Sequence, residues 1–326
     1  MRFSRRNFLH LAAGAVALSG LLALTGHSAW SQTRTIKIVV PFAPGGGTDV
    51  LARLLGEQIG RIQVLTMIVE NRPGAGTVIA TEAVARAAPD GNTVLVMANS
   101  FVINPHLRKL NYDPLTSFLP VCNLVNNPLV IVVNNASPYR TLSELLNAAR
   151  AKPGELTFAS AGPATTNHIA IEALKRKANV NMTYVPYPGT APAVNSLLGE
   201  HVTAALVDYG GVSEHLKVGK LRALATPSRM RIEQMSEVPT VAESGYRDYE
   251  QENWNGVVVP ARTSQEMVSQ LAGWFSAAVR APEVKPKLFA QGFIPVGTCG
   301  ADFAALLRKQ YEEFGRIIRE ANIKGE

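Results

Sequence analysis

Hydrophobic and polar positions alternate with two different periods along the chain from residue 36 onward. Ile36–Val40 is a continuous apolar run, which predicts a buried strand. Beyond it, Leu51, Leu54 and Ile59 recur at helical spacing, so a helix is expected to follow the strand. The alternation continues to residue 97. A βαβαβ order of this kind predicts a parallel sheet with right-handed crossovers.

A second series of strands and helices follows a break at residues 134–138. The chain shows no repeat with a period of about 20–50 residues, which excludes a solenoid. The predicted strands are 36–40, 67–70, 93–97, 129–133, 156–160, 182–185, 202–207, 221–226 and 255–259, and the predicted helices are 51–59, 80–88, 169–177, 191–198, 264–280 and 301–322.

Two of the predicted strands run into loops that contain glycine and then into a helix. The first loop is Pro44–Asp49, with three consecutive glycines, and the second is Ala161–Ala164. Ligands of open α/β sheets bind beyond the carboxyl ends of the strands. Because the first N–H groups of a helix lack internal partners and carry partial positive charge, such loops favour an anion. We expect two lobes, each with one loop, facing each other across a cleft.

These loops do not have the pattern of a nucleotide site. A P-loop needs a lysine after its last glycine, but Thr48 and Asp49 follow Gly47. Gly74-Ala75-Gly76 also follows a strand, yet residue 79 is Ile79 and the dinucleotide fingerprint is broken. The segment is therefore expected to be a turn packed close to a neighbour. For Gly45–Gly47 the alternative is a tight turn before a helix cap.

A catalytic role has weaker support. Ser160, His168 and Asp208 do not follow the order of an α/β-hydrolase, and the nucleophile elbow would need glycine at Phe158. An exported hydrolase that uses Ser160 and His168 remains the alternative hypothesis. His168 could instead bind a ligand or simply pack. No paired carboxylates or metal-ligand spacings are present, so no enzyme, metal or cofactor is expected.

The N-terminus has the pattern of an export signal. Ser4–Leu9 contains a twin-arginine pattern, and a mostly apolar stretch follows that is short for a membrane span. Ala29-Trp30-Ser31 resembles a cleavage site, so residues 1–31 are predicted to be a signal peptide cleaved near Ser31/Gln32. We therefore expect a periplasmic protein, with an uncleaved anchor as the alternative.

Composition and charge limit the classes of partner that the protein is expected to bind. The chain has 326 residues, 47% of them hydrophobic, which suggests about two domains. Removal of Arg2, Arg5 and Arg6 with the signal lowers the formal net charge from +7 to +4, too weak to indicate nucleic acid binding. Because disulfide geometry is demanding, Cys122 and Cys299 are expected to be two unpaired, partly buried thiols, with a disulfide as the alternative.

Several stretches together resemble one family, the Bug proteins, which are extracytoplasmic solute-binding receptors of tripartite tricarboxylate transporters. The resemblance runs from about residue 35 to the C-terminus. It rests on the stretches IKIVVPFAPGGGTDVLARLL, VENRPGAGT, APDGNTVLV, FASAGPATTNHIAIEAL, VPYPGTAPAVNSLLG and EVPTVAESGY.

The resemblance implies an α/β fold of the two-lobed periplasmic-binding-protein type (type II), closing on its ligand like a flytrap. Leu129–Val133 and Asn255–Val259 are the implied crossing strands. Lobe one is expected to comprise 33–131 plus 257–326, and lobe two 132–256. The departures from the family pattern are Thr77, Ile79 and Asn99-Ser100-Phe101, where Phe101 would suit an apolar ligand or simply pack.

The implied function is capture of a small organic carboxylate (a dicarboxylate, tricarboxylate or aromatic acid) and its delivery to membrane permease subunits. A carboxylate accepts up to about four hydrogen bonds, so uncharged amides at two helix starts could hold it without a cation. We expect a monomer without nucleic acid partners. A ligand-sensing co-receptor is a second alternative, and the acid itself is not identified. The implied ligand-binding residues are Phe42, Pro44, Gly45, Gly46, Gly47, Thr48, Asp49, Ser100, Ser160, Ala161, Gly162, Thr165, Thr166, His168, Tyr187 and Asp208.

Overall fold

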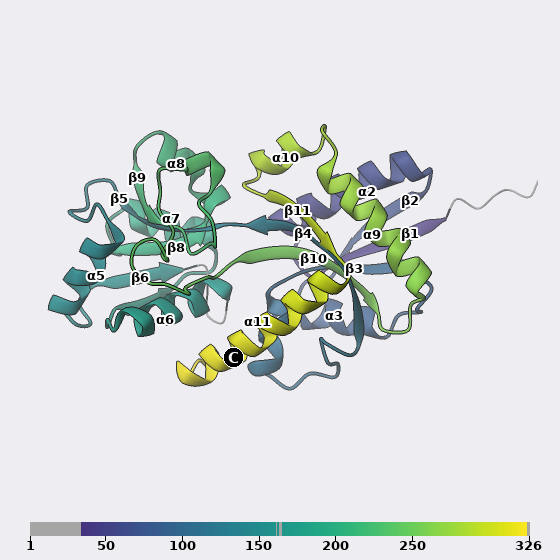
Figure 1. Cartoon of the computed structure of the whole chain (residues 1–326), viewed down its shortest axis with the longest axis horizontal. Coiled ribbons are helices and arrows are strands. Elements are labelled where there is room, and N and C mark those ends of the chain that lie inside the picture. The colour runs from purple at the N-terminus through teal and green to yellow at the C-terminus, as the bar shows by residue number, and fades with distance from the viewer. Residues whose placement is uncertain (1–33, 161, 163–164, 325–326) are drawn as a thin grey trace, which may run out of the picture. The chain divides into compact units, whose positions relative to one another are not determined.

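The structure is a computed structural model that describes residues 34–160, 162 and 165–324. The predicted signal peptide lies outside these residues. Thr35–Glu326 form one compact unit, built on two β-sheets (Figure 1). Within the described part of the chain, no helix is both long enough and apolar enough to cross a bilayer.

The first sheet has six strands in the order β11-β4-β10-β3-β1-β2. β1 pairs in parallel with β2 and β3, as the alternation of strands and helices predicts, whereas β10 pairs antiparallel with β3 and β4, and β11 with β4. The bounds are β1 (Thr35–Val40), β2 (Thr66–Asn71), β3 (Thr93–Ala98), β4 (Phe118–Asn127), β10 (Asn253–Pro260) and β11 (Ile294–Cys299).

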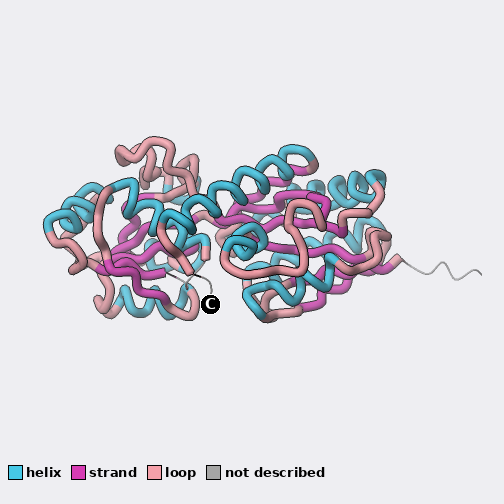
Figure 2. Tube along the Cα trace, turned by 90° about the horizontal axis from the view of Figure 1, so that it is seen from below, coloured by secondary structure: helices cyan, strands magenta, loops and turns pink. Residues whose placement is uncertain are grey.

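Helices cover both faces of this sheet (Figure 2). Ile36, Ile38 and Val40 of β1 face one core, which α2 and α9 complete, while Val39 faces the other with α3, α4 and α11. This double burial explains why β1 is a continuous apolar run. The bounds are α2 (Gly47–Gln63), α3 (Val78–Ala85), α4 (Ser100–Ile103), α9 (Gln265–Arg280), α10 (Lys285–Ala290) and α11 (Ala301–Glu320), with 3₁₀ turns at Ala75–Thr77 and Asn104–His106.

The second sheet has five strands in the order β7-β6-β8-β5-β9. β6 pairs in parallel with β7 and β8, and β5 runs antiparallel to β8 and β9. The bounds are β5 (Leu129–Asn134), β6 (Thr157–Ser160), β7 (Thr183–Pro186), β8 (Ala204–Asp208), β9 (Leu221–Ala225), α5 (Leu142–Ala151), α6 (Thr166–Ala178), α7 (Thr190–Leu198) and α8 (Ser213–Lys217), with 3₁₀ turns at Tyr209–Gly211 and Glu233–Met235.

The chain passes between the two sheets twice. The first passage is at Pro128, which separates β4 from β5, and the second lies just before Asn253, where β10 begins. Proline lacks the N–H that a continuous ladder would need, so it suits this change of sheet. The segments expected to cross, Leu129–Val133 and Asn255–Val259, each pair within one sheet only, and the passages precede them.

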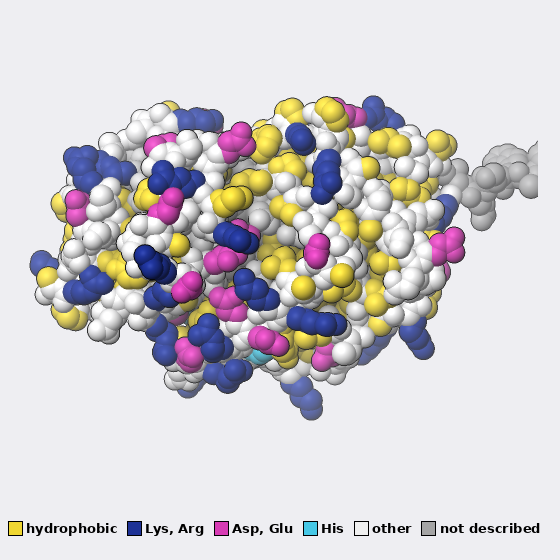
Figure 3. Space-filling model, in the orientation of Figure 1, with side chains coloured by type: hydrophobic (Ala, Val, Ile, Leu, Met, Phe, Trp, Pro, Cys, Tyr) yellow, Lys and Arg dark blue, Asp and Glu magenta, His cyan; other side chains and the backbone are white. Residues whose placement is uncertain are grey.

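The two lobes also touch where α11 passes α6. Ile169 of α6 packs in the same core cluster as Phe314 and Ile317 of α11. Arg176 forms an ion pair with Glu320 at 3.4 Å from Nη2 to Oε2. Figure 3 shows acidic and basic side chains interspersed over this part of the surface. The lobes are therefore joined by a packed contact as well as by the two passages.

Cys122 and Cys299 form a disulfide, so the expectation of two unpaired thiols is wrong. The two residues lie directly opposite each other in the antiparallel pairing of β4 with β11. Neither strand was predicted. β4 contains Pro120 together with several polar asparagines, and such residues are unfavourable for a strand in local sequence. Because neither strand was predicted, the distance between the two cysteines could not be inferred from the sequence.

The remaining predicted strands and helices overlap observed ones, with boundaries shifted by a few residues. Besides β4 and β11, the elements that were not predicted are α4, α5, α8 and α10. Phe101, considered as a ligand contact or a packing residue, is buried in the core against Phe118, with ring centroids 5.1 Å apart. Its role is packing.

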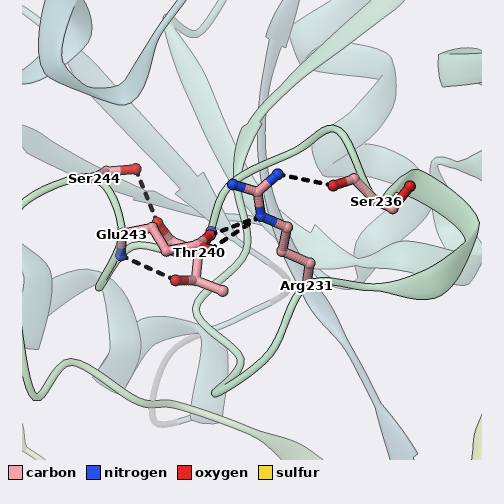
Figure 4. Close-up of polar contacts among 5 residues, drawn as sticks. All are labelled: Arg231, Ser236, Thr240, Glu243 and Ser244. Carbon is pink, nitrogen blue, oxygen red and sulfur yellow. Dashed lines mark hydrogen bonds and ion pairs between the residues drawn. The ribbon is translucent and has the colours of Figure 1, made fainter.

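The stretch EVPTVAESGY closes a turn in the segment that leads back to the first sheet (Figure 4). The N–H of Thr240 donates to Glu243 Oε2 at 2.7 Å, and the N–H of Glu243 donates to Thr240 Oγ1 at 3.0 Å. This reciprocal pair has the form of a capping box. Arg231 pairs with Glu243 at 2.9 Å and also donates to the carbonyl of Ser236. The motif therefore orders a turn and places no side chain in the cavity described below.

Candidate functional site

A cavity of about 660 Å³ lies beyond the carboxyl ends of the parallel strands of both sheets. The first lobe contributes the segments after β1, β2 and β3, and the second lobe those after β6 and β8, which is where ligands of open α/β sheets bind. The lining residues are Phe42, Ala75, Gly76, Thr77, Ala98, Asn99, Ser100, Ile103, Asn104, Arg108, Gly162, Thr165, Thr166, Asn167, Asp208 and Asn253.

The glycine loop after β1 lies next to this cavity, but only Phe42 of the segment lines it. Pro44 and Gly45–Gly47 are exposed, and α2 begins at Gly47 with Gly46 in extended conformation as its N-cap. Thr48 accepts a hydrogen bond from Asn255 of β10 at 2.9 Å. The loop thus presents its backbone to solvent on the first lobe.

Asp49 holds this glycine loop in place through hydrogen bonds. Its carboxylate accepts hydrogen bonds from the N–H of Gly45 at 2.8 Å, from Arg53 at 3.0 Å and from Asn71 at 2.8 Å. Burial by itself would raise the pKa of Asp49, but the hydrogen bonds from Arg53, Gly45 and Asn71 outweigh burial and lower the pKa below its ordinary value of 3.8. Asp49 is therefore a charged structural residue and does not line the cavity.

The loop after β6 is held by three hydroxyl groups. Tyr184 donates to the carbonyl of Gly162 at 2.7 Å, Thr165 donates to the same carbonyl at 2.9 Å, and the buried Ser160 hydroxyl lies 2.9 Å from that of Tyr184. Ala161 lies outside the described residues. Gly162 and Thr165 reach the cavity, whereas Ser160 lies beneath the loop.

α6 begins at the cavity wall. Thr165 is its N-cap and accepts a hydrogen bond from the N–H of His168 at 3.3 Å. Asn167 is buried and donates to the carbonyl of Leu206 in β8 at 3.2 Å, which ties the helix start to the sheet. The first turn of this helix therefore has a fixed orientation toward the cavity.

His168 and Tyr187 do not line the cavity. The ring of His168 stacks on Tyr184 with centroids 3.9 Å apart, and burial lowers the pKa of His168. The Tyr187 hydroxyl hydrogen bonds to that of Ser196. Ser160 Oγ has Tyr184 and Gly162 as partners. These contacts give Ser160, His168 and Tyr187 packing roles in this conformation.

Asp208 lies at the end of β8 and lines the cavity. Its Oδ1 accepts from Asn253 at 3.1 Å and from Asn127 at 3.3 Å, and its Oδ2 accepts from Thr190 at 3.3 Å. Loss of water around the carboxyl raises its pKa, and the hydrogen bonds from Asn253 and Thr190 act in the opposite direction. Asp208 is thus anchored at the junction of the lobes.

The turn after β2 forms a wall of the cavity. From the sequence, this segment was expected only to be a turn packed close to a neighbour. Gly74, Ala75, Gly76 and Thr77 all have positive φ, of 130°, 46°, 60° and 85°. Such values are unusual for a β-branched residue such as Thr77. Asn104 holds the turn by donating to the carbonyl of Gly76 at 2.7 Å and to Thr77 Oγ1 at 3.2 Å. Asn104 therefore braces this wall of the cavity.

Several of the lining residues were not predicted from the sequence. Asn104 and Arg108 follow α4, an unpredicted element, and Asn253 lies just before the predicted strand 255–259. Asn99 links β3 to β10 because its Oδ1 accepts from the N–H of Trp254 at 3.0 Å. From the sequence, Asn99 is named only as a departure from the family pattern, and it lies two residues after the predicted strand 93–97.

Comparison with known proteins agrees with this architecture. Residues 51–323 match the model of the tripartite tricarboxylate transporter family receptor. The protein BugT of Bordetella pertussis is 31% identical over 312 residues, covering 95% of each chain.

Two solved structures have the same fold. The periplasmic binding protein BugD is 31% identical with a TM-score of 0.74, covering 90% of this chain and 99% of BugD. The protein Rpa4515 of R. palustris, solved with adipate, is 29% identical with a TM-score of 0.78, covering 91% of this chain and all of that one (100%).

These matches confirm the two-lobed α/β periplasmic-binding-protein fold and the resemblance to Bug receptors. They also confirm the general function, an extracytoplasmic receptor that binds a carboxylate. The family acts in the periplasm together with transporter subunits. The chain belongs to the receptors of the tripartite tricarboxylate transporter family.

Proposed function

We propose that this receptor binds a small organic acid in the 660 Å³ cavity and holds one of its carboxylates at the start of α6. The observation that carries the proposal is the cavity itself, since its walls come from the strand ends of both sheets. Backbone N–H groups at Gly162, Thr165 and Thr166 and the Thr166 hydroxyl supply donors there, whereas the Thr165 hydroxyl already donates to the carbonyl of Gly162. A hydrogen bond to a charged group contributes about 1.5–3 kcal/mol, so three or four reach micromolar affinity after the costs of association.

The first lobe completes the site in two ways. Thr77 and Ser100 line the cavity and hydrogen bond to each other at 3.2 Å, so both hydroxyls are already ordered. We further propose that the Gly45–Thr48 loop reaches the ligand when the lobes close, because Phe42, which precedes it, already lines the cavity. Glycines at this helix start let the backbone approach a ligand closely.

Asp208 has a different task in this proposal. A carboxylate on the cavity wall would repel an acid group, but it accepts hydrogen bonds from an amine, a hydroxyl or a bound water. Asp208 therefore distinguishes among acids by their other substituents. The site as a whole binds and releases its ligand without chemical change, and Ser160 lacks the arrangement of a hydrolytic nucleophile because its hydroxyl partner is Tyr184.

The rest of the proposal concerns the cellular setting. Residues 1–31 act as a signal peptide that directs export and is cleaved near Ser31/Gln32. The mature protein acts as a periplasmic monomer. In this proposal the lobes divide near Pro128 and Asn253, where the chain passes between the two sheets. Closure around the acid would present a surface to the membrane permease subunits. Adipate, present in the related structure, is one acid for the first ligand panel.

Calorimetry of the purified protein tests this function. The panel contains dicarboxylates of about four to eight carbons, tricarboxylates and aromatic acids, alongside uncharged amides of the same acids. Binding of at least one acid at micromolar concentration, without binding of its amide, is expected. The proposal would be contradicted if no acid in the panel binds and if denaturation of freshly purified protein releases no bound acid.

A further inference from the structure

Arg108 lies on the cavity wall and has no part in the carboxylate cradle described above. Arg108 and Asp208 are the charged side chains among the described lining residues. Arg108 follows the 3₁₀ turn Asn104–His106, and its N–H donates to the carbonyl of Asn104 at 3.1 Å. Its backbone is therefore tied to Asn104, the residue that holds the wall-forming turn.

The guanidinium of Arg108 is positioned by that turn. Its Nη1 donates to the carbonyl of Ala75 at 3.2 Å. A Cβ atom at Gly76 would lie 3.3 Å from Nη1 and 3.4 Å from Nη2, so the absence of a side chain at Gly76 lets the planar group lie against the backbone. A hydrogen-bonded turn at positive φ thus positions a cation on the cavity wall.

Most of the hydrogen-bonding capacity of this guanidinium is unused within the protein. An arginine has five N–H donors. Within the described part of the chain, the carbonyl of Ala75 is the only hydrogen-bond acceptor for the group, its Nε is buried without a partner, and no carboxylate forms an ion pair with it within 4.0 Å. A partly buried cation of this kind favours an anion, because paired charges are the usual state of buried ones.

Resting on the proposed function, we propose that Arg108 binds a second carboxylate of the ligand and makes the site selective for dianionic acids. The cradle at Gly162 and Thr165–Asn167 belongs to the second lobe, whereas Arg108 belongs to the first. A diacid that reaches both would bridge the lobes, and a monoacid would leave Arg108 without its partner. Arginine suits this task because its planar fork matches a carboxylate.

The test compares matched ligands and matched variants by calorimetry. The ligands are straight-chain dicarboxylates and the monocarboxylates of equal length. Arg108→Gln removes the charge and keeps a polar side chain. Lys109→Gln is the control, because it removes the same charge from the adjacent, exposed residue, which does not line the cavity.

Arg108→Gln is expected to weaken binding of the best diacid about 10–100-fold and of the matching monoacid less than about twofold. Lys109→Gln is expected to leave both affinities unchanged. Arg108→Lys keeps the charge without the planar fork, so it should retain part of the preference for the diacid. Thermal unfolding of each variant verifies that it is folded. If Arg108→Gln does not fold, Arg108→Lys serves as the test.

An equal loss for both ligand types, or no loss for either, would overturn the role of Arg108 while the proposed function stands. A wild-type protein that binds monoacids as tightly as diacids would have the same consequence. If the wild-type protein binds neither class of acid, the proposed function fails and this inference fails with it.

Discussion

The side-chain amide of Asn253 donates a hydrogen bond to Oδ1 of Asp208 at 3.1 Å, across the junction between the two lobes. Asn127 donates to the same oxygen at 3.3 Å. Asn127 immediately precedes the first passage between the sheets, and Asn253 immediately follows the second. Asp208 is therefore fixed to both connecting segments while it lines the cavity. A ligand group that hydrogen bonds to Asp208 is therefore linked to both segments that connect the lobes.

Replacing Asp208 by Asn should change which acid is preferred more than whether acids bind. The carboxylate accepts hydrogen bonds only, so its loss should weaken acids that carry an amine or hydroxyl about tenfold or more. Acids without such a donor should lose little. Calorimetry with hydroxylated and unsubstituted acids of equal length measures the difference. Asp248→Asn, at an exposed residue outside the cavity, is the control, and an equal loss across all acids would refute this role.

Gly46→Val should weaken acid binding while leaving the fold intact. Gly46 has a φ of −75°, and a Cβ there would have its nearest contact at 3.6 Å, from the carbonyl oxygen of Ala43, so a side chain fits the free protein. A branched side chain would nevertheless cover the helix start that we propose reaches the ligand. A loss of about tenfold in affinity is expected. Gly273→Val, where a Cβ meets nothing within 4 Å, is the matched control; unchanged affinity in folded Gly46→Val would remove this loop from the site.

The carboxylate of Asp49 should stabilise the fold in a pH-dependent way. Because the pKa of Asp49 is lower in the folded chain than its ordinary value of 3.8, the unfolded chain takes up the proton first as pH falls. The stabilisation is fully present above about pH 4 and is lost as pH falls through the lowered pKa. Asp49→Asn should lower the free energy of unfolding at pH 7 by about 1–3 kcal/mol and flatten its decline in acid.

Urea unfolding at a series of pH values measures this effect. Asp248→Asn again provides a control, since this exposed side chain should leave the acid limb of the curve unchanged. Curves for wild type and Asp49→Asn that stay parallel from neutral pH to pH 3 would show that Asp49 is not the titrating group.

Removing the disulfide between Cys122 and Cys299 should destabilise the first lobe. The bond closes a loop with a sequence separation of 177 residues, and loss of a native disulfide typically costs about 2–5 kcal/mol. The Cys122→Ser, Cys299→Ser double variant should show this loss in urea unfolding, and reductant should affect the wild type only. Thiol titration in denaturant is a direct check, because two reactive thiols without reductant would show that the bond does not form.

Local sequence was sufficient for elements whose burial leaves a recognisable pattern of apolar residues. β1 and β5 are apolar on both faces because helices cover both sides of each sheet, so each appears as an unbroken apolar run. α5 and β4 were missed for different reasons. α5 is a short amphipathic helix beside a break in the pattern, and β4 is a central strand despite Pro120, because its neighbours in the sheet supply the remaining pairing.

The candidate site divides in the same way. Phe42, Ser100, Gly162, Thr165, Thr166 and Asp208 line the cavity, and each lies within a few residues of the end of a predicted strand or the start of a predicted helix. Arg108 and Asn104 reach it through a short helix and a turn that have no recognisable pattern. Ser160, His168 and Tyr187 lie in the motifs of the family yet contact Tyr184 or Ser196 and do not line the cavity.

The sequence by itself determined the family and the alternation of strands and helices, and it predicted the edge of each sheet at which the cavity lies, because these depend on residues close together in the chain. Only the tertiary structure decided the partner of Cys122, the anchoring of Asp208 by Asn127 and Asn253, and the arrival of Arg108 at the cavity wall. Each of these depends on strand register and on turns that join residues far apart in the chain, and neither leaves a periodic signal in the residues involved.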